Sequence, residues 1–127
     1  MSTYLTLFPF LKGPQALRET FILCETKLEP IQDYSIYAQI DVLSFTDESV
    51  KPHIKTEVLP AQLWIGVYID EGIERTREST DGEELRFVYA QALKKWKIPG
   101  DAHWQMKAVK AYIDELPNDI PILLYIS

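Results

Sequence analysis

The chain has few of the residues that build metal centres and nucleophilic sites. Its 127 residues include one cysteine, two histidines and five scattered glycines. A metal site needs several His, Cys or carboxylate ligands at short spacing, whereas His53 and His103 lie far apart in the sequence. It contains no glycine-rich phosphate loop, dinucleotide fingerprint or Gly-x-Ser-x-Gly sequence. We therefore expect no metal, no cofactor and no catalytic residue: the protein is not an enzyme.

The single cysteine also bears on the compartment. Cys24 follows the apolar run Phe-Ile-Leu, so we expect a buried small hydrophobic residue and not a reactive thiolate. A lone cysteine forms no intrachain disulfide and suits a reducing compartment. No apolar run approaches the roughly 18 residues of a membrane span, and the start lacks the charge pattern of a signal peptide. These features predict a cytoplasmic protein without membrane contact.

What the chain does have is the composition of one globular domain over residues 1–127. Hydrophobic residues make up 46% and charged residues 25%. The net charge of −6 opposes binding to nucleic acid, because such binding depends on Lys and Arg neutralising phosphates. An acidic protein of this kind is soluble and attracts a basic partner.

Alternating and apolar segments predict strands. Residues 34–45 alternate apolar and polar side chains, which is typical of a half-buried strand. Residues 63–70 also predict a strand, with aliphatic side chains on one face and Trp64, Gly66 and Tyr68 on the other, so we expect both of its faces to be covered. Residues 4–11 are expected to form a strand or an extended arm. Residues 18–28 favour a strand, although part of this segment also has helical spacing. The nearly all-apolar residues 120–126 predict a strand inside the sheet.

Two segments predict helices. Residues 83–96 place six apolar side chains on one helical face, with acidic residues at the start and lysines at the end. Residues 101–116 show a second amphipathic pattern, with Asp101 as the candidate cap. The acidic residues 70–82 form either a solvated loop or a hairpin arm ending at the turn signal Asp81-Gly82. If that hairpin exists, residues 84–98 are its second strand and the first helix is absent.

This element order predicts an α+β fold. We expect a mainly antiparallel sheet with two C-terminal amphipathic helices on one face and a final internal strand. The alternative is a β-rich sandwich with a long hairpin at residues 62–98 and one helix.

Large aromatic residues near the two predicted helices suggest a binding surface. Phe87 falls outside the apolar face of the first helix, and Trp96 and Trp104 flank the turn between the helices. Aromatic side chains are the usual anchors of protein interfaces. We therefore expect a non-catalytic interaction domain, such as an inhibitor, immunity protein, adaptor or assembly subunit, whose partner is another protein or a second copy.

Two other function classes stay open. A small-molecule-binding or enzymatic domain would use a pocket between sheet and helices, with Asp41, Tyr37, Tyr68 or His103. A single-stranded nucleic-acid binder would use lysines interleaved with aromatic residues. The residues concerned are Lys94, Lys95, Trp96, Lys97, His103, Trp104, Lys107 and Lys110. The negative net charge makes nucleic acid the less expected partner.

Overall fold

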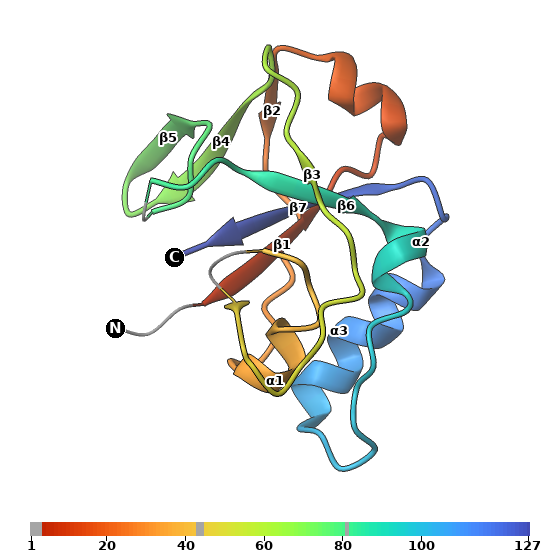
Figure 1. Cartoon of the computed structure of the whole chain (residues 1–127). Helices are drawn as coiled ribbons and strands as arrows, with labels where there is room; N and C mark the ends of the chain where they lie inside the picture. The colour runs from red at the N-terminus through yellow and green to blue at the C-terminus, as the bar shows by residue number, and fades with distance from the viewer. Residues whose placement is uncertain (1–3, 43–44, 81) are drawn as a thin grey trace.

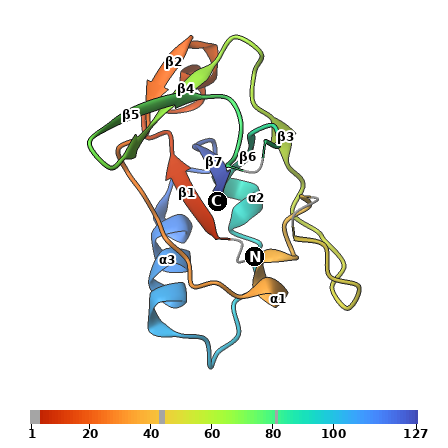
Figure 2. The ribbon, with the colours of Figure 1, turned by 90° about the vertical axis from the view of Figure 1, so that its left-hand side faces the viewer.

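The structure is a computed structural model that describes residues 4–42, 45–80 and 82–127. Its elements form three layers, with helices below a four-stranded sheet and a three-stranded sheet above it (Figure 1). The same order of layers is visible from the side (Figure 2). The predicted α+β class is confirmed.

The first sheet lies in the middle layer and is antiparallel throughout. Its strand order is β1 (Leu5–Pro9), β7 (Pro121–Ile126), β6 (Arg86–Tyr89) and β3 (Glu57–Val58). Because β7 pairs with β1 on one side and with β6 on the other, the internal position predicted for residues 120–126 is confirmed.

Both faces of this sheet are covered, which explains why β7 is nearly all apolar. Ile122 and Leu124 point into the core against the helices. Leu123 lies between them in sequence and points into a second core, formed between the two sheets. A strand buried on both faces has no need for polar alternation.

The second sheet is formed by β2 (Phe21–Leu23), β4 (Trp64–Ile69) and β5 (Gly72–Thr76). β2 runs parallel to β4, and β5 pairs with β4 as a hairpin. The hairpin turn lies at residues 70–71, where Asp70 adopts a left-handed φ of 41°. This turn joins β4 to β5. The predicted alternative of a hairpin arm that ends near Gly82 is also supported, because Glu78 and Glu84 form an antiparallel bridge and the Ser79 backbone N–H donates a 2.8 Å hydrogen bond to the Glu83 carbonyl oxygen. Asp81 lies outside the described residues.

The α-helices pack on the face of the first sheet that is turned away from the second sheet. They are α1 (Tyr34–Tyr37), α2 (Ala90–Leu93) and α3 (Trp104–Glu115), and a 3-10 helix, η1 (Pro14–Arg18), precedes β2. α3 confirms the helix predicted for residues 101–116. Its cap is His103 and not Asp101, because the His103 Nδ1 accepts a 3.1 Å hydrogen bond from the Gln105 backbone N–H.

The strand predicted for residues 34–45 is wrong. The segment begins with α1, whose first turn is capped by the Asp33 carboxylate, which accepts the backbone N–H of Ser35 at 3.0 Å and of Ile36 at 3.4 Å. Ile36 and Tyr37 are both buried, although adjacent residues of a half-buried strand face opposite ways. The alternation therefore reflects a buried irregular segment. Leu43 and Ser44 lie outside the described residues.

The helix predicted for residues 83–96 is also wrong in its first half. β6 occupies Arg86–Tyr89, and only the single turn α2 is helical. Phe87 faces the second sheet and Val88 faces the helices, so consecutive apolar residues are buried on opposite sides. The helical spacing arose because a doubly covered strand is apolar at nearly every position. The alternative, a strand in residues 84–98, is correct for β6, but β6 pairs with β3 and β7 and not with β5.

The chain leaves the first sheet after β3 and returns to it at β6. The Leu59 backbone N–H donates a 3.0 Å hydrogen bond to the Leu85 carbonyl oxygen, which joins the two ends of this excursion. The Arg77 guanidinium donates to the carbonyl oxygens of Pro60, at 2.7 Å, and of Leu63. This arginine fixes the segment that leads into β4.

Candidate functional site

The second sheet has one face against the core and one face toward solvent. The register places Trp64 and Tyr68 of β4 beside Phe21 of β2 and Ile73 of β5, respectively. Their neighbours in sequence, such as Ile65 and Val67, are buried between the sheets. The solvent-facing set, called here the outer face, comprises Phe21, Leu23, Trp64, Gly66, Tyr68, Ile73 and Arg75.

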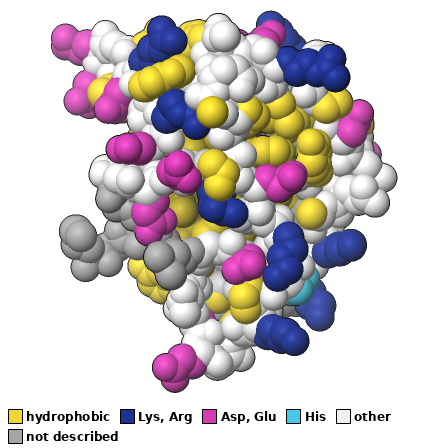
Figure 3. Space-filling model, turned by 45° about the horizontal axis from the view of Figure 1, so that its top comes forward, with side chains coloured by type: hydrophobic (Ala, Val, Ile, Leu, Met, Phe, Trp, Pro, Cys, Tyr) yellow, Lys and Arg dark blue, Asp and Glu magenta, His cyan; other side chains and the backbone are white. Residues whose placement is uncertain are grey.

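Large apolar side chains are exposed on this outer face. Tyr68 is 61% and Ile73 is 53% accessible to solvent, and Phe21 and Trp64 are also exposed. Figure 3 shows hydrophobic side chains next to Lys and Arg side chains over the upper part of the molecule. Single exposed apolar residues are common, but a contiguous group indicates an interaction surface.

Arg75 lies on the outer face at the edge strand β5, opposite Gly66 of β4. Its guanidinium carbon is 5.5 Å from the centroid of the Phe21 ring and 5.4 Å from that of the Trp64 ring. Stacking on two rings orders this long side chain and leaves the N–H edges of the guanidinium for other partners. Among the described residues, Arg75 forms no ion pair.

Gly66 makes the outer face continuous. A Cβ atom at this position would lie 2.7 Å from the Phe21 Cζ and 3.0 Å from the Ile73 Cγ2. Phe21 and Ile73 therefore approach each other across β4 because no side chain separates them. A glycine inside a strand often marks such a close approach.

Acidic residues flank the outer face at the end of the hairpin. Asp70 and Glu71 form the turn, and Glu74 follows on β5; all three are exposed. Figure 3 shows acidic side chains gathered along the left-hand side, the side on which β5 lies in Figure 1. The outer face thus carries the cation Arg75 on β5 and has the anions Asp70 and Glu71 at its hairpin end, whereas Glu74 pairs with the core-facing Val67 and belongs to the opposite face of the sheet.

The three residues predicted from the sequence as partner-binding do not share one surface. Phe87 is buried between the sheets, where its ring packs edge-on against Tyr89 at 5.5 Å. Trp96 is buried in the core between the first sheet and the helices. The expected exposure of these two residues is therefore wrong. Trp104, at the start of α3, is 72% exposed.

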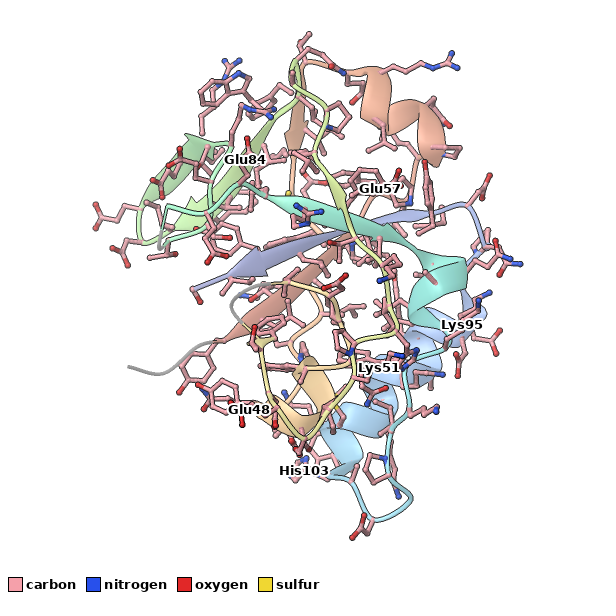
Figure 4. The ribbon with its side chains drawn as sticks, viewed as in Figure 1. Glu48, Lys51, Glu57, Glu84, Lys95 and His103 are labelled. Carbon is pink, nitrogen blue, oxygen red and sulfur yellow. The ribbon has the colours of Figure 1, made fainter. Side chains whose placement is uncertain are left out.

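The residues considered for a catalytic pocket lie apart. Tyr37 is fully buried, Tyr68 is on the outer face, and Asp41 and His103 line different cavities. Figure 4 shows His103 at the lower end of the molecule, far from Glu84 beside β5. Burial raises the pKa of the Cys24 thiol to about 12, so this side chain stays protonated near neutral pH.

A cavity with a volume of about 560 Å³ lies between residues 38–52 and the ends of β6 and β7. Its floor is apolar, and its rim carries carboxylates together with Arg86, which donates to the Thr56 hydroxyl at 2.6 Å. Asp47 on the rim accepts hydrogen bonds from the side chain and backbone of Ser49, which lower its pKa. No His or Cys belongs to the described lining.

The basic and aromatic cluster considered for nucleic acid is only partly on the surface. Trp96 points inward, Lys94 donates to the Asn118 side chain at 2.7 Å, and Lys110 pairs with Asp114 at 2.7 Å. Trp104 stacks beside His103 with ring centroids 5.2 Å apart. Of the aromatic side chains predicted to stack on bases, only Trp104 and the neighbouring His103 are exposed.

Neither a metal centre nor a membrane helix emerges from the part of the chain that the structure describes. Within residues 4–42, 45–80 and 82–127, no three His, Cys, Asp or Glu side chains gather as metal ligands do. The described helices are too short or too polar to cross a bilayer.

Reasoning from the sequence missed the outer face, although one signal for it was present. The alternation in residues 63–70 puts Trp64, Gly66 and Tyr68 on one side of a strand. These side chains are apolar or small, so a second buried face was expected.

Comparison of the chain with protein-family models, with curated proteins and with solved structures gave no significant match.

Proposed function

We propose that this protein is a non-catalytic interaction domain that binds a protein partner through the outer face. Such domains include inhibitors, immunity proteins, adaptors and assembly subunits. The observation that carries the proposal is the contiguous group of exposed aromatic and aliphatic side chains around the stacked Arg75. Trp, Tyr and Arg are the residues that most often dominate the energy of interfaces.

The proposed surface differs from the helical surface predicted from the sequence. Phe87 and Trp96 are buried and offer no side-chain surface to a partner. The outer face instead combines four large exposed side chains on strands that the sheet holds rigid, so binding costs little ordering of the backbone. The acidic hairpin turn adds long-range attraction to basic groups on a partner, chiefly by speeding association.

The experiment compares affinity capture by tagged variants in cells that make the protein. Tyr68→Ser and Ile73→Ser remove exposed apolar side chains from the outer face, so both should lose a captured protein, including an untagged copy of the chain. Tyr112→Ser is the matched control, because Tyr112 is an exposed tyrosine on α3. Capture of the same proteins by all variants would contradict the proposal.

We also propose the cytoplasm as the location, because a single unpaired cysteine suits a reducing compartment. Fractionation of the source cells tests this location: recovery of the protein outside the cytoplasmic fraction would contradict it.

A further inference from the structure

We propose that the partner at the outer face is a second copy of this chain, related to the first by a two-fold axis that passes beside Ile73. The inference rests on the proposed function and adds the identity of the partner. It follows from the order of groups along the β4–β5 hairpin, where the apolar pair Tyr68 and Ile73 lies between the cation Arg75 on β5 and the anion Glu71 in the turn.

The centre of this arrangement is the cross-strand pair of Tyr68 and Ile73. Arg75 lies two residues from Ile73 in one direction along β5, and Glu71 lies two residues away in the other. At a strand rise of about 3.3 Å per residue, Arg75 is about 7 Å along β5 from Ile73, whereas Glu71 lies in the two-residue turn just before β5 begins at Gly72. Neither charged side chain forms an ion pair with another described residue.

A two-fold axis across the hairpin reverses the strand direction between the copies. Ile73 then faces Ile73 of the second copy, and Arg75 faces Glu71 of the second copy. The same contact recurs on the other side of the axis, since an isologous interface repeats each contact. The surface is therefore complementary to itself in charge and in apolar character.

Arg75 is already ordered for such a contact. Its guanidinium stacks on Phe21 and Trp64, at 5.5 and 5.4 Å from the two ring centroids. Stacking leaves the planar edge of the guanidinium free to donate two parallel hydrogen bonds to one carboxylate. Little conformational freedom remains to be lost when Glu71 of the second copy binds there.

The size of the outer face sets the expected strength. β2, β4 and β5 contain 3, 6 and 5 residues, so at a rise of about 3.3 Å and a spacing of about 4.8 Å they present a flat area of about 220 Å². A standard interface buries about 800 Å² per partner, so the dimer is at the weak end of specific complexes. We expect a dissociation constant in the micromolar range, roughly 1–100 µM.

Sedimentation velocity on the full chain tests the dimer over protein concentrations from about 1 µM to about 1 mM. The wild-type chain should pass from monomer to dimer within this range. Glu71→Arg and Arg75→Glu each place like charges at both contacts, and each should weaken self-association by at least about tenfold.

Mixing the two single variants gives the sharpest result. In a mixed pair, the Glu71→Arg chain carries arginine at both positions and the Arg75→Glu chain carries glutamate at both positions. Both contacts therefore again join opposite charges. An equimolar mixture of the two variants should associate at least about tenfold more tightly than either variant alone. The double variant should recover self-association, because each of its two contacts also pairs an arginine with a glutamate.

Lys107→Glu and Glu115→Arg on α3 are the matched controls, because both residues are exposed charges away from the hairpin. Neither control should change the association, and circular dichroism should show that every variant is folded. A wild-type chain that stays monomeric, or a mixture no tighter than its components, overturns the inference. If such a monomer still captures another protein through Tyr68 and Ile73, the proposed function stands and only the identity of the partner is wrong.

Discussion

The indole N–H of Trp96 donates a buried 2.9 Å hydrogen bond to the backbone carbonyl oxygen of Ile36, sixty residues earlier in the chain. This bond joins the segment after α2 to α1 and satisfies a carbonyl group inside the helix-side core. It shows how a tryptophan beside a polar turn can be a core residue, because both its ring and its single donor are used internally.

Replacing Trp96 by phenylalanine should lower the free energy of unfolding by about 1–3 kcal/mol. The smaller ring leaves space in the core and the bond to the Ile36 carbonyl is lost, although that carbonyl still accepts the Gln39 backbone N–H at 3.3 Å. Urea denaturation measures the change. Trp104→Phe is the control, because Trp104 is exposed, and its effect should stay within about 0.5 kcal/mol. Equal losses in both variants would contradict this role of Trp96.

Replacement by alanine should lower the stability of the protein much more at Phe87 than at Trp104. Phe87→Ala opens a cavity between the sheets and should cost about 3–5 kcal/mol of stability. Trp104→Ala removes an exposed ring and should cost less than about 0.5 kcal/mol. Thermal unfolding monitored by circular dichroism measures both. A mild loss for Phe87→Ala would indicate that the space between the sheets can collapse.

The buried thiol of Cys24 should make stability fall in alkali. Its pKa rises from 9.0 to about 12 because burial disfavours the thiolate. The unfolded chain therefore loses this proton first, so the contribution of Cys24 to the unfolding free energy is constant below about pH 9 and falls by about 1.4 kcal/mol per pH unit between about pH 9 and about pH 12.

Comparison with Cys24→Ala isolates this contribution. Burial also raises the pKa of Tyr37, which titrates with the same sign in both proteins. Urea unfolding in the presence of a reductant, at about pH 8 and about pH 11, should show a steeper fall for the wild-type chain. Parallel pH profiles would contradict the assignment.

Truncation after Pro117 should prevent folding. It removes β7, which pairs with β1 and β6, and buried side chains such as Ile122 and Leu124 that contribute about 1.5–3 kcal/mol each. Native domains are stable by only about 5–15 kcal/mol. Circular dichroism should show no cooperative unfolding, whereas a chain that lacks only Ser127 should unfold cooperatively.

The elements predicted correctly are those whose hydrophobic pattern is compatible with only one type of secondary structure. α3 has one buried face and one wet face, and β7 is an apolar run too short for a buried helix. The failures are segments buried on two sides. In β6 the residues Phe87 and Val88 enter different cores, and in α1 Ile36 and Tyr37 enter one core together. Periodicity cannot separate helix from strand when nearly every residue is apolar.

The outer face could not be predicted, because solvent exposure depends on which layers are present. Trp64 and Tyr68 occupy a strand whose other face is also apolar, so the sequence alone indicates that both faces of β4 pack against other elements. In the structure only the face that carries Ile65 and Val67 does so. Gly66 is the clearest local signal, since a glycine within an aromatic strand indicates a close approach across it.

The hydrogen bond between Leu59 and Leu85 has a consequence for the order in which the chain folds. β3 and β6 form a ladder that encloses the β4–β5 hairpin, so one hairpin is nested inside another. The inner hairpin closes through a two-residue turn, and its formation shortens the loop that must close before β3 meets β6. Stopped-flow kinetics should then show that Val67→Ala slows folding, while Phe87→Ala mainly speeds unfolding. The second sheet would in this way serve as the template on which the open edge of the first sheet is completed.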